Sequence, residues 1–99
     1  MTGCNGRSNS EEARILARRA IYEQDFYRGS LLLVRGGCDN LHTQSVYLIH
    51  MNNYRNAHNL MGMVRSWVGI YQLDAEEDFV QAAAYELLNT TFDNLIISD

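Results

Sequence analysis

The sequence contains no proline and no lysine. Proline interrupts helices because it lacks an amide N–H and clashes with the preceding turn, so its absence favours long helices. Apolar runs are short, and none approaches the roughly 20 residues that a membrane-spanning helix needs. The first residues also lack the apolar stretch of a secretory signal. We therefore expect a soluble, cytoplasmic protein with no membrane contact.

Cysteine is scarce, with only Cys4 and Cys38. Two cysteines do not make a disulfide framework, and their spacing matches no zinc pattern. We expect both to be free thiols in a reducing compartment. Cys38 lies near His42, but nucleophilic catalysis also needs an orienting group and an oxyanion site, and the sequence shows neither.

Motifs for nucleotides and metals are absent as well. The glycines form no GxGxxG pattern, and without lysine there is no Walker motif. His42, His50 and His58 are spaced by eight, which spreads them around a helix, whereas metal-binding histidines on one helix are usually three or four residues apart. We predict no catalytic residue, no cofactor and no metal, and hence a protein that is not an enzyme.

Charge is unevenly distributed along the 99 residues, whose net charge is −4. Residues 1–38 carry a net +2, and residues 39–99 carry a net −6. An acidic chain repels nucleic acid at long range, so we expect no direct nucleic-acid binding. The simplest interpretation is that a basic helix packs beside an acidic one.

The N-terminal third suggests a leader followed by a helix. Residues 1–9 are small and polar, and we interpret them as a flexible leader before a single helical domain at 10–99. Ser10 followed by two glutamates is typical of a helix start, and we predict a first helix over residues 11–28. Gly29 could end it or lie inside it, and the apolar residues 31–34 fit a strand or a helical turn. We favour helix, ended by Gly36 and Gly37.

Residues 41–73 form the central stretch of the chain. Apolar residues recur there at alternating steps of four and three, as on one helical face. Asp39 or Asn40 could cap this helix, which would exceed 30 residues, so a bend is plausible near Asn52 and Asn53 or at Gly62. The positions on this face are Tyr47, Met51, Tyr54, Ala57, Met61, Val64, Val68 and Tyr71.

The last helix is predicted to begin at an Asp74 cap, with Glu76, Glu77 and Asp78 in its first turn, where the helix dipole favours acids. The helix could fray at residues 89–91, which have weak helical propensity. Short connections favour antiparallel neighbours. The sequence therefore predicts an all-α fold, a compact antiparallel helical bundle of three principal helices, with the long central helix possibly broken into two.

Aromatic and polar residues beside the apolar stripe suggest a contact surface. Tyrosine and tryptophan combine large apolar area with a hydrogen-bonding group, which suits interfaces as well as cores. The apolar faces are wider than three helices can cover, so we predict a homodimer with the central helix in its interface. The candidate partner-binding residues are Tyr47, Tyr54, Arg55, Trp67, Asp74, Glu76, Glu77 and Asp78.

Three functions are compatible with these observations. The first is a small acidic, non-enzymatic protein-interaction module that binds a partner protein. The second is an acidic inhibitor that occupies the nucleic-acid-binding surface of its target, since in size and charge the chain is similar to small accessory proteins of phages and plasmids. The third is a metal- or ligand-binding bundle with a cavity lined by His50, Met51, Tyr54 and His58.

Overall fold

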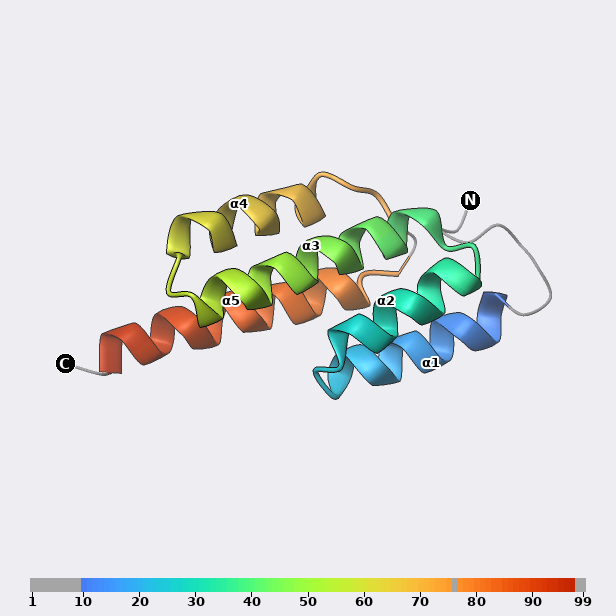
Figure 1. Ribbon diagram of the computed structural model, residues 1–99, viewed down its shortest axis with the longest axis horizontal. Coiled ribbons are helices and arrows are strands. Elements are labelled where there is room, and N and C mark those ends of the chain that lie inside the picture. Colours follow the sequence, from blue (N-terminus) through green and yellow to red (C-terminus); the bar gives the residue numbers. More distant parts are fainter. Residues whose placement is uncertain (1–9, 76, 98–99) are drawn as a thin grey trace.

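The computed structural model describes residues 10–75 and 77–97, with the backbone alone for residues 96 and 97. Every regular element within these two ranges is a helix. The five helices are α1 (Ser10–Tyr22), α2 (Phe26–Arg35), α3 (Asp39–Asn56), α4 (Leu60–Tyr71) and α5 (Phe79–Ile97) (Figure 1). The all-α class is confirmed, but the prediction of three principal helices is wrong. None of these five helices is long and apolar enough to cross a membrane.

Three consecutive helix junctions are built alike, and they account for the higher number of helices. At each junction a residue with positive φ ends one helix: Gln24 (65°), Gly37 (69°) and His58 (58°). After α3, the His58 N–H donates to the Arg55 carbonyl at 3.0 Å. The next N–H, that of Asn59, donates to the Tyr54 carbonyl at 2.8 Å. This is the Schellman arrangement, which satisfies the last carbonyls of a helix.

The residue after each positive-φ position is the N-cap of the following helix: Asp25, Cys38 and Asn59. Asp25 accepts a hydrogen bond from the Arg28 N–H, and the Asn59 side chain accepts one from the Gly62 N–H at 2.9 Å. Ending one helix and capping the next within three residues reverses the chain direction sharply. Both long helices expected from the sequence are therefore broken, one after Tyr22 and one after Asn56.

Several expectations about helix ends need correction. The predicted first helix stops at Tyr22, and Gly29 lies inside α2, where an added Cβ would come within 2.7 Å of Ile21. Helix α3 starts after Cys38 rather than after Asp39 or Asn40. The stop at Gly36 and Gly37 and the helical state of residues 31–34 are confirmed.

Helix α5 also differs from the prediction. It begins at Phe79, so the acidic residues described at 74–78 precede the helix instead of forming its first turn. It continues through residues 89–91 without fraying, and the Thr90 and Thr91 hydroxyls donate back to carbonyls of Glu86 and Leu87. The leader predicted at residues 1–9 lies outside the described residues.

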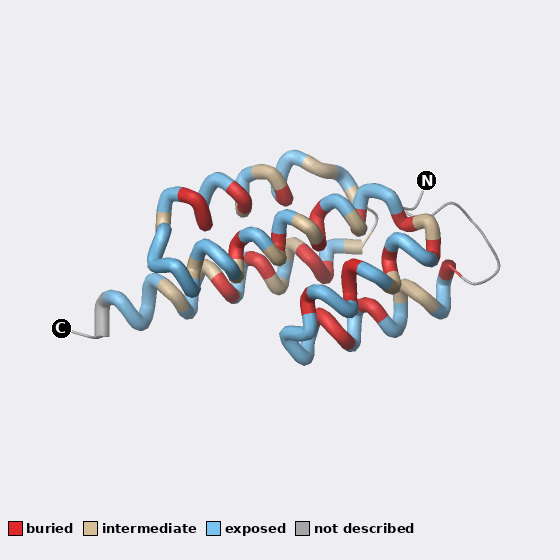
Figure 2. Tube along the Cα trace, viewed as in Figure 1, coloured by how far each residue is buried: buried red, intermediate tan, exposed pale blue. Residues whose placement is uncertain are grey.

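The core lies around α3, which packs against α2, α4 and α5. Figure 2 shows buried positions recurring along each helix, between exposed ones. Leu33, Leu48, Met51, Met63 and Val80 have no exposed surface, so α2, α3, α4 and α5 all contribute to one core. The α1–α2 hairpin lies on one side of α3 and α4 on the other (Figure 1). Among the described helices, α4 packs against α3 and α5, and none of the others covers its remaining face.

Candidate functional site

The open face of α4 carries a row of exposed apolar side chains, which we call the α4 seam: Met61, Val64, Val68 and Tyr71. Met61 is 73% exposed, Val68 40% and Tyr71 65%. The spacing of three, four and three keeps all four on one side of the helix. Arg65 is the one charged residue of α4. An apolar helix face of this length with a single charge is typical of a contact surface.

The seam was only partly visible in the sequence. Its four residues belong to the apolar stripe identified there, which was expected to continue along one helix. Because the chain reverses at His58, Met51 points into the core while Met61, Val64 and Val68 face solvent. A stripe that is continuous in sequence is therefore divided between core and surface.

The other side of α4 is held by two tyrosine–glycine pairs. The Tyr54 ring covers Gly62, and the Tyr47 ring covers Gly69. A Cβ added to Gly62 would lie 2.5 Å from Tyr54 Cδ1, and one added to Gly69 would lie 2.9 Å from Tyr47 Cε1. The glycines let α3 and α4 approach closely, with tyrosines seven residues apart facing glycines seven residues apart. Both tyrosines, predicted as partner-binding residues, thus brace the back of α4.

A shallow hollow of about 450 Å³, wide open to solvent, borders the seam where α4 meets the second half of α5. Phe92 of α5 contributes the far wall and Arg65 the polar edge. Tyr85 lies seven residues before Phe92, hence on the same side of α5, and both rings are exposed. The apolar surface therefore extends from α4 onto α5. The residues lining the hollow are Leu60, Met61, Val64, Arg65 and Phe92.

Trp67 links the seam to the core. It is half-buried against the core cluster, and its ring centroid lies 5.4 Å from that of Tyr71, with the rings tilted by 48°. This contact holds Tyr71 while leaving most of its ring exposed. Of the predicted partner-binding residues, Trp67 is the one that directly supports the seam.

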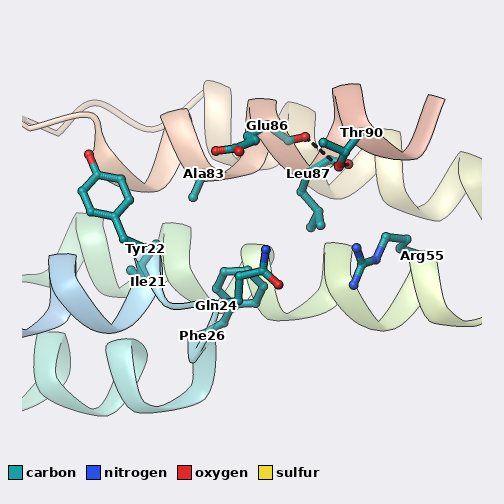
Figure 3. Close-up of a pocket in the computed structure, with 9 residues that line it drawn as sticks. All are labelled: Ile21, Tyr22, Gln24, Phe26, Arg55, Ala83, Glu86, Leu87 and Thr90. Carbon is teal, nitrogen blue, oxygen red and sulfur yellow. Dashed lines mark hydrogen bonds between the residues drawn. The ribbon is translucent and has the colours of Figure 1, made fainter. Parts of the chain in front are cut away.

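A second, smaller hollow lies between α5, α3 and the α1–α2 junction (Figure 3). Its volume is about 100 Å³, well below the usual range of small-molecule sites. Arg55 borders this hollow and donates to the Asn52 side chain at 2.8 Å. The side chains drawn around it are Ile21, Tyr22, Gln24, Phe26, Arg55, Ala83, Glu86, Leu87 and Thr90.

Arginines of α1 stabilise its contact with the start of α5. Arg14 forms an ion pair with Glu77 at 3.5 Å. Arg18 lies over the Tyr22 ring, 5.4 Å from its centroid, and hydrogen bonding with the Tyr22 side chain raises the pKa of the guanidinium. The Arg14–Glu77 pair joins the basic N-terminal part of the chain to an acid further along it.

The predicted acidic site lies at the opposite end of α4 from Tyr54 and Arg55. Asp74 and Asp78 are exposed, Glu77 pairs with Arg14, and Glu76 lies outside the described residues. The Asn40 side chain donates to the Asp74 carbonyl at 2.7 Å, which brings the start of α3 to this end. The N-terminal ends of α1, α3 and α5 all point to this side of the molecule (Figure 1). Their dipoles account for the acids there.

The histidines and the cysteine considered as ligands or nucleophiles do not lie together in one site. His50 is exposed and Met51 is buried, so the proposed cavity lined by these residues with Tyr54 and His58 does not form. Cys38 is buried and disulfide-bonded rather than free, which removes it as a nucleophile. Among the described side chains, no three His, Cys, Asp or Glu residues lie close enough to hold a metal ion.

Comparisons with known proteins returned no family model, no curated protein and no solved structure that matches this chain.

Proposed function

We propose that this chain is a small, non-enzymatic protein-interaction module that acts by binding another protein chain through the α4 seam. The observation that carries this proposal is the exposure of four apolar side chains on one face of α4, beside a hollow formed with α5. Desolvating such a surface is favourable, and aromatic anchors such as Tyr71 contribute disproportionately to protein contacts.

The other two functions draw less support. Of the described acids expected to imitate nucleic acid, Glu77 pairs with Arg14, which leaves Asp74 and Asp78 exposed. Of the residues expected to line a ligand cavity, His50 and His58 are exposed and Met51 is buried in the core.

Two valines offer a matched test. Val68 in the seam and Val34 on α2 are both helical and similarly exposed, at 40% and 48%. Three immobilised proteins, the wild type, Val68→Glu and Val34→Glu, would each be used to capture proteins from a lysate of the native host. A further copy of this chain counts as a captured protein. We expect wild type and Val34→Glu to retain the same protein and Val68→Glu to lose it. Equal retention by all three would refute a role for the seam.

A further inference from the structure

The α4 seam is spaced symmetrically about its own midpoint. Its members lie at steps of three, four and three, so two antiparallel copies of α4 can face each other in register. Met61 then lies opposite Tyr71 of the second copy, and Val64 lies opposite Val68. The two small residues are central and the two large ones are terminal, which suits close approach in the middle. Such a contact is isologous, as in a two-fold symmetric dimer.

At each end of the paired seams, a projecting Tyr71 from one copy meets the hollow beside Met61 of the other copy. Tyr71 projects with 65% of its surface exposed, and the hollow beside Met61 is about 450 Å³. The antiparallel register brings each Tyr71 to the other copy's hollow, between Phe92 and Arg65. The ring can pack against Phe92, and its face can receive the Arg65 guanidinium, since cations are attracted to aromatic faces. In this arrangement Arg65 of one copy binds the Tyr71 ring of the other.

Charge favours the α4 seam over the apolar face of α2 as the site of self-contact. The α2 face has exposed Tyr27, Leu31 and Val34, but Arg28 and Arg35 accompany them on that short helix. A second copy would bring four arginines together there. The α4 seam carries Arg65 alone, with an aromatic partner available for it.

We infer that the occupant of the α4 seam is a second copy of this chain, docked antiparallel through α4 with each Tyr71 in the partner's α4–α5 hollow. This deepens the proposed function, on which it rests, by naming the partner. A 12-residue helix is about 18 Å long, so α4 with its α5 flank covers less than the roughly 800 Å² per partner of a standard interface. A contact of this size is typical of weak, concentration-dependent association.

Sedimentation velocity of the full chain between about 1 and 500 µM tests the dimer. We expect wild type and Val34→Glu to shift with concentration from 11.3 kDa towards twice that mass. Val68→Glu should remain a monomer at every concentration, because the dimer would bury two uncompensated carboxylates. Tyr71→Ala should weaken association at least tenfold, and Tyr71→Phe should restore it. Circular dichroism of each variant confirms that its helices are intact.

Cross-linking tests the register. Cys38 is already disulfide-bonded, so new cysteines can be introduced on α4. Under mild oxidation a mixture of Val64→Cys and Val68→Cys chains should cross-link faster than either variant alone, since the two positions face each other across the contact. Faster cross-linking of Val64→Cys by itself would overturn the antiparallel arrangement.

A wild-type chain that remains monomeric up to 500 µM would overturn the self-dimer. The lysate capture then decides the broader proposal independently. If Val68→Glu loses a different protein that Val34→Glu retains, the seam binds that protein and the proposed function stands. If it does not, both proposals fail.

Discussion

His58 and Gln24 hold left-handed backbone conformations without being glycine. Both end a helix in the same way as Gly37, and each is followed by a residue that caps the next helix. A side chain in this conformation is destabilised by about 1–2 kcal/mol because Cβ crowds the following carbonyl. These two junctions are therefore locally strained.

Replacing His58 with glycine should relieve this strain. We expect His58→Gly to stabilise the protein by about 0.5–1 kcal/mol, after allowing for the greater entropy of glycine in the unfolded chain. Gly37→Ala should destabilise it by about 1 kcal/mol for the opposite reason. Urea denaturation measures both effects. A loss of stability in His58→Gly would show that the imidazole makes a contact that outweighs the backbone strain.

Gln44 is a buried polar side chain that joins α3 to the end of α4. Its amide nitrogen donates to the carbonyls of Ile70 and Leu73, at 3.1 and 3.0 Å. Both carbonyls have a second donor, the Leu73 N–H and the Gln81 side chain respectively. The Gln44 Oε1 atom is buried and has no hydrogen-bond partner among the residues that the structure describes. The side chain therefore both contributes two hydrogen bonds and leaves one acceptor unsatisfied.

Gln44→Met should cost only about 1 kcal/mol, because the unsatisfied acceptor is removed together with the two hydrogen bonds. Gln44→Glu should cost at least about 3 kcal/mol at neutral pH, since it places a buried carboxylate against two carbonyl oxygens. Chemical denaturation of the two variants gives the comparison. If Gln44→Glu is as stable as the wild type, the amide does not face those carbonyls.

At the scale of helices, the close approach of α3 and α4 depends on the tyrosine–glycine pairs. Alanine is normally favoured over glycine inside a helix by about 1 kcal/mol. At Gly62, however, the new methyl group would meet the base of the Tyr54 ring, 2.5–2.8 Å away. Packing should therefore outweigh helical propensity at this position.

We expect Gly62→Ala to destabilise the protein by about 1–2 kcal/mol, because the Tyr54 ring must move. In a Tyr54→Ala background the same change should be neutral or stabilising, since the clash is gone and the propensity gain remains. A thermodynamic cycle of the four proteins measures this coupling. Additive effects would mean that the ring does not lie over Gly62.

The sequence predicted which residues form helices better than it predicted where helices end. The stop at Gly36 and Gly37 was predictable because glycine marks the left-handed position openly. The stops at Gln24 and His58 were harder to place, because residues other than glycine hold the left-handed position there. The acids at 74–78 resemble a helix start, yet α5 begins only at Phe79. The sequence allowed a bend near Asn52 and Asn53 or at Gly62, but the chain turns between these positions, at His58, and this turn separates α4 and its seam from α3.

At the scale of the whole molecule, the predicted partner-binding residues divide among different roles. Tyr47 and Tyr54 brace α4 from behind, Trp67 supports Tyr71, and Glu77 pairs with Arg14. Exposed apolar side chains remain on every helix, and those of α4 form a single row with one charged residue, Arg65, in that helix. Sequence periodicity identified these apolar positions, but only the arrangement of helices separates those in the core from those facing solvent.

The central claim is that the α4 seam is where this chain meets a second copy of itself. Amide chemical shifts of ¹⁵N-labelled wild-type protein, recorded from about 10 to 1000 µM, test it residue by residue. We predict concentration-dependent shifts at residues 60–72 and 85–95, with the amides of α2 unchanged. Shifts confined to residues 27–35, or no shift at any residue, would contradict the claim.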